Sequence, residues 1–295
     1  MTLDQLRVFV AVAERQHVTR AAEALNLAQS AVSTAIANIE GRHATKLFHR
    51  VGRGIELTEA GRVFLVEARA VLARAEAAEL VLADLSGLRR GTLSLQASQT
   101  IANHWLPRHL VAFRKAYREI GVRLSVGNTE QAAAAVHEGT AELGFVEGGL
   151  DDPALASTTV AQDHLLIVVA PGHPLAAIER PAPEDLHAAE WVLREAGSGT
   201  RSEFEDALAG CGVPPSSLNV TLELPSNEAL LSAVVAGAGA CALSESVVAG
   251  ALRTGDLACV RFDLPARDFR VLRHKERYRS RAADALLDLI REASR

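Results

Sequence analysis

The chain has 295 residues, of which 48% are hydrophobic, so at roughly 100–200 residues per domain it can form two or more domains with separate cores. It contains no run of about 18 uncharged apolar residues, and charged side chains occur throughout its start, from Asp4 to Arg20, so we expect a cytoplasmic protein without a membrane span or export signal. The net charge of −5 is uneven, since residues 1–90 hold 12 of the 31 Lys and Arg and 10 of the 36 Asp and Glu, a balance of +2 that leaves −7 for the remainder.

The first part of the chain has the spacing of short helices followed by a hairpin. Apolar side chains recur at helical intervals between Leu3 and Ala13, which predicts a first helix. We expect Thr19 to cap a second helix and Asn26 to end it, because Asn tolerates the left-handed backbone of a tight turn. A third helix is predicted over about residues 29–40. Residues 49–57 contain two glycines among basic side chains, which is typical of a β-hairpin.

A long helix is predicted from Thr58 to about Leu88. This stretch lacks proline, is rich in alanine and carries leucine and valine near the helical period. Thirty residues of helix would be roughly 45 Å long. A helix so long and so exposed usually pairs with another, so we expect a linker and dimerisation element.

After Gly91 the chain alternates between strand and helix patterns. The predicted strands are 92–97, 122–126, 142–146, 165–170, 219–224, 240–243 and 269–273, and the predicted helices are 105–117, 130–138, 183–188, 202–209, 227–236, 246–252 and 281–293. Such alternation indicates parallel α/β layers. Because the strands are too many for one compact sheet, we expect two subdomains, with the chain crossing near Ala161 and returning near Ala266.

A DNA-binding motif follows from the first three helices. Two helices joined by a three-residue turn form a helix-turn-helix, whose second helix enters the major groove. Short polar side chains on that helix can read base edges or contact phosphates, and the hairpin arginines would contact the DNA as a wing. The candidate DNA-binding residues are Thr19, Gln29, Ser30, Ser33, Thr34, Asn38, Arg50 and Arg53. The alternative from these residues alone is a three-helix bundle whose polar face is merely solvated.

Residues 1–62 resemble the N-terminal domain of LysR-type transcriptional regulators. The residues that carry the resemblance are Leu6, Phe9, Val12-Ala13-Glu14, Ala21-Ala22, Leu25, Gln29-Ser30-Ala31-Val32-Ser33, Ile36, Glu40, Leu47-Phe48, Arg50, Leu57-Thr58 and Ala60-Gly61. The resemblance implies homodimers and homotetramers that bind and bend double-stranded promoter DNA, with RNA polymerase as a further candidate partner. It does not imply an enzyme.

The resemblance also implies the architecture of the whole chain. A mainly α winged helix-turn-helix would occupy residues 1–58 and a linker helix residues 59–90. An α/β effector domain would occupy residues 91–295, as two periplasmic-binding-protein-like subdomains. The first would comprise 91–161 and 266–295, and the second 162–265.

Three positions depart from the family pattern. Gln16-His17-Val18 stands where the family usually has Gly-Ser-Phe, and His43-Ala44 stands where it usually has Leu-Gly. Ala28 replaces a frequent serine, so a helix-capping contact is expected to be missing.

Polar residues follow several predicted strands, at the edge where parallel α/β folds bind ligands. The candidate effector-binding residues are Ser98, Gln99, Thr100, Asn128, Glu147, Ser198, Gly199, Thr200 and Arg201. Hydroxyls, a helix N-terminus and an arginine suit a small oxyanion. Taken singly, Ser98, Thr129, Thr200 and Ser226 can equally be ordinary helix caps. Glu147 would repel an anion unless it is protonated, paired with Arg201 or turned away.

The family resemblance places the effector between the two α/β subdomains. Residues 98–103, 124–128, 144–148 and 194–201 look like the branch linked to sulfur assimilation, including its sulfite-responsive members, which suggests sulfite or sulfate as effector. No cofactor and no metal are expected, since the three cysteines are far apart. The alternative is a solute-binding protein or an enzyme that uses the same α/β cleft, although no nucleophile–base pair or nucleotide motif is found.

Overall fold

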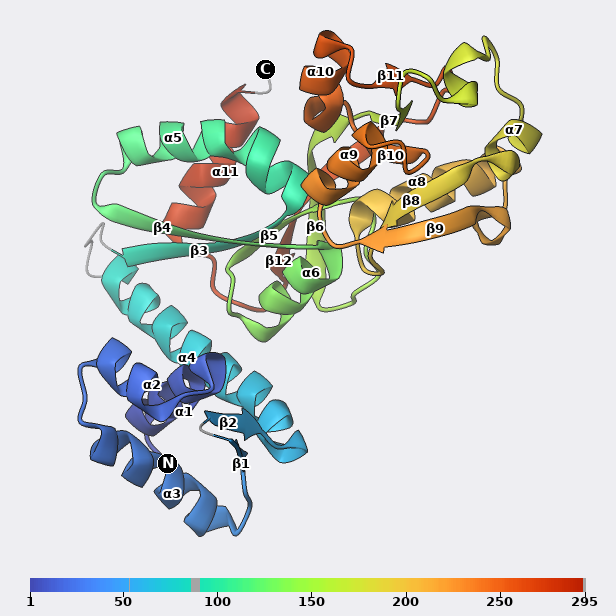
Figure 1. Cartoon of the computed structure of the whole chain (residues 1–295). Helices are drawn as coiled ribbons and strands as arrows, with labels where there is room; N and C mark the ends of the chain where they lie inside the picture. The colour runs from blue at the N-terminus through green and yellow to red at the C-terminus, as the bar shows by residue number, and fades with distance from the viewer. Residues whose placement is uncertain (53, 86–90, 294–295) are drawn as a thin grey trace. The chain divides into compact units, whose positions relative to one another are not determined.

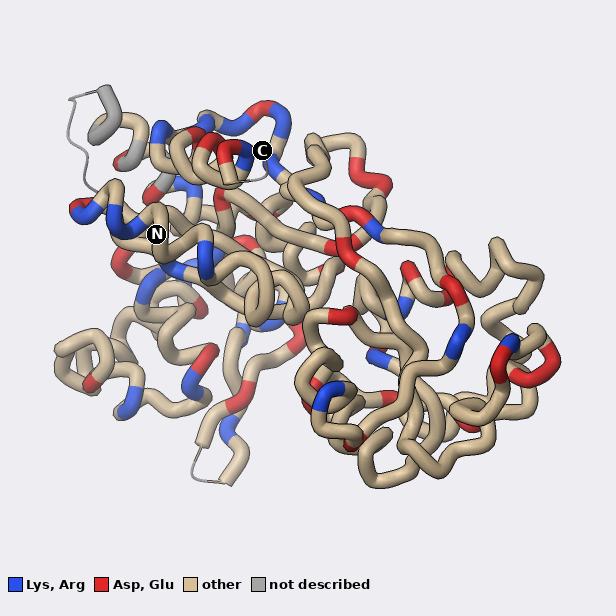
Figure 2. Tube along the Cα trace, turned by 90° about the horizontal axis from the view of Figure 1, so that it is seen from above, with Lys and Arg blue, Asp and Glu red and all other residues tan. Residues whose placement is uncertain are grey.

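The computed structural model describes residues 1–52, 54–85 and 91–293. Its first compact unit comprises the described residues up to 85, and the second comprises the bulk of those from Gly91 onward. Basic and acidic positions are interspersed along the trace of both units (Figure 2). Among the described residues, no helix is both long and apolar enough to cross a membrane.

The first unit is a helical cluster followed by a hairpin and a long helix (Figure 1). Its elements are α1 (Leu3–Arg15), α2 (Val18–Leu25), α3 (Gln29–His43), β1 (Phe48–Val51), β2 (Gly54–Leu57) and α4 (Glu59–Leu85). Phe9 of α1 is fully buried, and its ring centroid lies 5.4 Å from that of Phe48 and 4.7 Å from that of Phe64. One aromatic cluster therefore joins α1, the hairpin and α4 in a single core.

The three helices agree with the sequence except at their ends. Asn26 ends α2 in the left-handed conformation, with φ 53°, as predicted. The prediction of Thr19 as the cap of α2 is wrong, because the helix starts at Val18 and His17 accepts a hydrogen bond from the main-chain N–H of Arg20. Helix α3 runs three residues past its predicted end at Glu40, to His43. Its N-cap, Ala28, makes no side-chain capping bond, as expected.

The other departures from the family pattern coincide with left-handed backbone. Gln16 and Ala44 both have φ 48°, and with Asn26 they are the non-glycine residues of positive φ in the described chain. Glycine adopts this conformation freely, whereas an L-residue pays about 1–2 kcal/mol. The glycines of the family pattern are thus replaced here at positions that favour glycine.

The second unit begins with a mixed five-stranded sheet. Its order is β4 (Ile120–Gly127), β3 (Gly91–Ser98), β5 (Leu143–Glu147), β12 (Arg267–His274) and β6 (Leu155–Asp163). Strands β4, β3 and β5 are parallel, whereas β12 runs antiparallel to both β5 and β6. A short π-helix, η1 (Ile101–Trp105), leads into α5 (Leu106–Ala116). Helices α5 and α11 (Arg281–Ala293) pack with the sheet in one buried cluster. Helix α6 (Thr129–Glu138) belongs to a second buried cluster.

The remaining elements form a second α/β group. An antiparallel sheet has the order β10 (Cys241–Ser244), β7 (Leu165–Val169) and β11 (Ala258–Cys259), and β8 (Glu190–Arg194) pairs in parallel with β9 (Asn219–Leu224). A bridge between Trp191 and Ala240 joins the two ladders. The helices of this group are η2 (Pro174–Ala177), α7 (Pro183–Ala188), α8 (Gly199–Gly210), η3 (Pro215–Ser217), α9 (Asn227–Val235) and α10 (Glu245–Thr254).

The seven predicted strands are present, and β3, β4 and β5, and β8 with β9, pair in parallel as expected, whereas β12 and the β10–β7–β11 sheet contain antiparallel pairs. Strands β6, β8 and β11 were not predicted. The polar run Ser157-Thr158-Thr159 in β6 is exposed, so this strand lacks the alternation that marks a half-buried strand. The predicted crossing near Ala161 falls within β6, and the predicted return near Ala266 immediately precedes β12. The subdomain boundaries stay a prediction.

Candidate DNA-binding and effector sites

The outer face of α3 is exposed and polar. A turn of three residues, 26–28, joins it to α2. All five predicted groove-facing residues of α3 are exposed, namely Gln29, Ser30, Ser33, Thr34 and Asn38. Their short side chains can reach base edges or phosphates, while Val32 and Ile39 of the same helix are buried in the core.

The remaining predicted DNA-binding residues lie on α2 and the hairpin. Thr19 is half-buried in the first turn of α2, and Arg50 is exposed on β1. Arg53 lies outside the described residues. The hairpin is held against the helices by a hydrogen bond from the main-chain N–H of Ile55 to the carbonyl of Gln16.

Glu40 fixes the hairpin to the end of α3. Its carboxylate accepts hydrogen bonds from the main-chain N–H groups of Leu47 (2.9 Å) and Phe48 (3.3 Å), and from the Lys46 ammonium (2.6 Å). Burial acts to raise the pKa of Glu40, but these hydrogen bonds outweigh it and hold the pKa below its ordinary value. A buried carboxylate thus sets where the wing begins.

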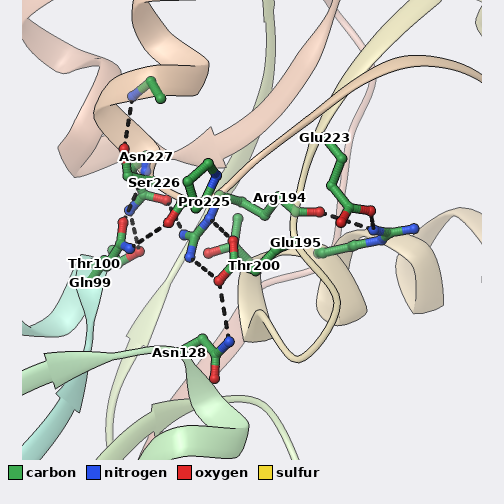
Figure 3. Close-up of polar contacts among 12 residues, drawn as sticks. Gln99, Thr100, Asn128, Arg194, Glu195, Thr200, Glu223, Pro225, Ser226 and Asn227 are labelled. Atoms are coloured by element: carbon green, nitrogen blue, oxygen red, sulfur yellow. Dashed lines mark hydrogen bonds and ion pairs between the residues drawn. The ribbon is translucent and has the colours of Figure 1, made fainter. Parts of the chain in front are cut away.

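In the second unit, residues after β3 meet the start of α9 through a polar network (Figure 3). The Gln99 amide donates to the carbonyl of Pro225 (2.9 Å) and accepts from the main-chain N–H of Asn227 (3.0 Å). The Asn227 amide donates to the hydroxyl of Thr100 (3.2 Å). Thr100 and Asn227 are each 1% exposed, so the bond between their side chains links the end of β3 to the second α/β group without competition from water, whereas the Gln99–Pro225 bond is exposed.

The network continues through Arg194, the last residue of β8. Its guanidinium donates to Asn227 Oδ1 (2.6 Å) and to the carboxylate of Glu195 (2.7 and 2.8 Å). Glu195 also accepts from the amide of Asn128 (3.2 Å), which follows β4. Burial acts to raise the pKa of Glu195, but the hydrogen bonds from Arg194 and Asn128 hold it below its ordinary value.

A second buried cluster surrounds the start of α8. Ser198, Gly199 and Thr200 are all buried, and the N-cap Ser198 makes no side-chain capping bond. The Thr200 hydroxyl accepts from Arg267 (3.2 Å), whose guanidinium also pairs with Asp163 at 2.7 Å. Asp163 in turn accepts from the hydroxyl of Ser244 (2.7 Å).

Ser98 and Glu147 stand at the ends of neighbouring strands. Ser98 is 3% exposed and Glu147 2%, and strands β3 and β5 are adjacent and parallel. The Ser98 hydroxyl and Glu147 Oε1 have no hydrogen-bond partner among the described residues. Such atoms in a buried position are rare and call for an explanation.

Arg201 does not face Glu147. Its guanidinium donates to Glu205 (2.8 Å), to Glu223 (2.6 Å) and to the carbonyl of Arg194 (3.0 Å). It is therefore neutralised by two carboxylates, and the suggestion that it pairs with Glu147 is wrong.

Three residues that organise these contacts are not among the candidate effector-binding residues. Arg194, Asn227 and Arg267 are each at most 3% exposed and bind residues of two or more elements. Arg194 ends a strand, so the rule that selected Ser98 and Ser198 could have found it, and the same rule does mark Asn227, with Ser226, at the start of a predicted helix. Arg267 begins a strand and carries no such signal.

Two family models together cover nearly all of the chain. Residues 3–62 match the bacterial regulatory helix-turn-helix protein, lysR family, and residues 86–295 match the LysR substrate binding domain. The chain belongs to the LysR family. LysR proteins of this type are DNA-binding transcriptional regulators with a ligand-binding domain, and not enzymes.

Individual LysR regulators are similar over the full length. The HTH-type transcriptional regulator YeiE of Escherichia coli (strain K12) is 35% identical over 291 residues, which cover 98% of this chain and 96% of that protein. The crystal structure of CbnR, a LysR family regulator, has a TM-score of 0.73 at 22% identity and covers both chains completely. The regulatory domain of Synechocystis PCC6803 CcmR in complex with 2-PG has a TM-score of 0.63 at 26% identity and covers 70% of this chain and 98% of that one.

Proposed function

We propose that this LysR regulator senses a small oxyanion between its two α/β subdomains, 91–161 with 266–295 and 162–265. The observations that carry the proposal are the burial of four hydroxyls, Ser98 and Thr100 at the end of β3 and Ser198 and Thr200 at the start of α8, and the lack of a side-chain cap at that start. Hydroxyls and free N–H groups at a helix N-terminus suit an anion. Gln99, Asn128, Glu147 and Gly199 complete the proposed site, whereas Arg201, held by Glu205 and Glu223, would act from outside it.

Sulfite and sulfate are the first effectors to test. Their oxygens can accept hydrogen bonds from short hydroxyl side chains, and the resemblance of residues 98–103 and 194–201 to sulfur-responsive regulators favours them. The 2-PG bound by the CcmR regulatory domain is a further compound to test.

On the DNA side, we propose that α3 reads promoter sequence through Gln29, Ser30, Ser33, Thr34 and Asn38. Arg50 and Arg53 would contact the backbone, and Thr19 would position α2 against it. Long helix α4 exposes Val63, Val66, Val71 and Leu82, an apolar surface that favours pairing with a second copy. A homodimer, assembled further into a homotetramer, would act on DNA in the cytoplasm, with RNA polymerase as a further partner.

The experiment is a thermal shift of the full chain with sulfite, sulfate and 2-PG. A ligand that binds the folded state raises the melting temperature by mass action. We expect a shift that Thr100→Ala and Ser198→Ala abolish and that Ser217→Ala, an exposed serine on η3, leaves intact. A shift that survives both substitutions would remove the proposed site.

A further inference from the structure

Glu147 is the one proposed effector-site residue whose chemistry opposes an anion. It ends β5, is 2% exposed, and its Oε2 accepts a weak hydrogen bond of 3.4 Å from the hydroxyl of Thr129. Its other oxygen, Oε1, has no partner within the described part of the chain. A buried carboxylate oxygen without a donor costs free energy, so this atom marks a place where a donor is required.

The carboxylate lies against the start of α8. A Cβ atom built on Gly199, the first residue of that helix, would stand 3.1 Å from Glu147 Oε2 and 2.9 Å from the Glu147 carbonyl oxygen, and would clash with the Thr129 hydroxyl. Only a glycine lets the helix approach so closely. Glu147 therefore borders the same helix N-terminus that would attract an anionic ligand.

No arginine of the site is left to neutralise Glu147. Arg194 pairs with Glu195, Arg201 with Glu205 and Glu223, and Arg267 with Asp163. The start of α8 stabilises a carboxylate, which explains why Glu147 can stay there. It supplies no donor to Oε1, since that atom is unpartnered.

We propose that Glu147 accepts a hydrogen bond from the effector, which is a small oxyanion that still carries a proton. Hydrogen phosphate and bisulfite have such an O–H group, whereas sulfate near neutral pH has only acceptor oxygens and would leave Glu147 Oε1 without a donor. This inference rests on the oxyanion site proposed above. Glu147, whose negative charge opposes an anion, then determines which anion binds.

The test is isothermal titration of the full chain with sodium phosphate and sodium sulfate at pH 7 and constant ionic strength. The two probes are similar in size and differ in the proton. Because a site built around a buried acceptor strongly rejects an analogue that lacks the donor, we expect phosphate to bind about 100-fold or more tightly than sulfate. Glu147→Gln supplies an amide donor, so sulfate affinity should rise and the preference should fall below about tenfold.

The matched control is Glu205→Gln. It also removes one negative charge, but from α8, at a residue bound to Arg201, so it should keep the wild-type preference for phosphate over sulfate. If the wild-type chain binds sulfate as tightly as phosphate, the inference is overturned, and this outcome can be observed without any variant. If neither anion binds and sulfite gives no thermal shift, the oxyanion site itself is wrong, which separates the two failures.

Discussion

Replacing Glu40 with alanine should loosen the base of the wing while leaving the helices in place. The substitution leaves the main-chain N–H groups of Leu47 and Phe48 without their acceptor, and Leu47 is 5% exposed. A hydrogen bond to a charged group contributes about 1.5–3 kcal/mol. The ion pair to Lys46, whose side chain is 79% exposed, adds only about 0.5 kcal/mol. Counting only the shorter bond to the buried Leu47 N–H at full strength, together with the ion pair, we expect a loss of about 2–3.5 kcal/mol in the free energy of local opening.

Hydrogen exchange measures this loss at the residues concerned. Since about 1.4 kcal/mol corresponds to a factor of ten, the amides of Leu47 and Phe48 should exchange roughly 30- to 300-fold faster in Glu40→Ala. Glu40→Gln keeps an acceptor and should lie in between, and Lys46→Ala should exchange almost as the wild type does. Equal exchange rates in Glu40→Ala and Lys46→Ala would refute the assignment of the wing's position to this carboxylate.

The same carboxylate gives the wing a pH dependence of defined sign. The pKa of Glu40 is lower in the folded chain than its ordinary value of 4.5. A group with a depressed folded pKa stabilises the fold above its unfolded pKa and loses that contribution as the pH falls through the folded one. The difference in exchange between wild type and Glu40→Gln should therefore be constant above about pH 5 and shrink below pH 4.5.

Three further substitutions test other parts of the account. Ser33→Ala combined with Thr34→Ala should weaken specific DNA binding by about tenfold or more and non-specific binding much less; an equal loss on random DNA would show that these residues do not read sequence. Gly199→Ala should lower the free energy of unfolding by about 1–3 kcal/mol and with it the melting temperature of the full chain. Gly210→Ala at the far end of α8, with open space around it, should leave the melting temperature unchanged. Equal melting temperatures of the two variants would contradict the close approach of Glu147 to Gly199. Ala44→Gly should stabilise the first unit by about 0.5–1 kcal/mol because glycine adopts a positive φ without strain. Ala37→Gly within α3 should destabilise the unit by about 1 kcal/mol, and hydrogen exchange of the core amides measures both effects. A loss of stability in both variants would refute the strain at Ala44.

Local patterns predicted the helices and most strands because their signals lie within a few residues. The Asn26 turn, the hairpin and α11 follow from turn chemistry and periodicity. The antiparallel pairing of β12 with β6 could not be predicted, because strands about a hundred residues apart in the sequence pair without any signal in their local sequence patterns. The cap of α2 was misplaced because His17 is an unusual capping residue, and the rule favoured a nearby threonine.

The sequence predicted which strand-end residues belong to the candidate effector site, but it could not predict the hydrogen bonds that connect them. The polar residues after β3, β4 and β5 were found because ligands bind where parallel strands end. Their partners Asn227 and Glu195 lie in the second α/β group, where Arg194 joins the two, so only the fold brings them together. Arg201 shows the opposite error, since its charge suggested an anion ligand and its neighbours Glu205 and Glu223 neutralise it.

The most direct test of the central claim is a gel shift of the full chain on DNA from upstream of its own gene, with sulfite, phosphate or sulfate added in turn. We expect sequence-specific binding that weakens steeply as salt rises. We also expect a protonated oxyanion to change the affinity or the footprint through its preference for one conformation. Folded protein that fails to bind this DNA at low salt, or whose binding none of these anions changes, would contradict the central claim.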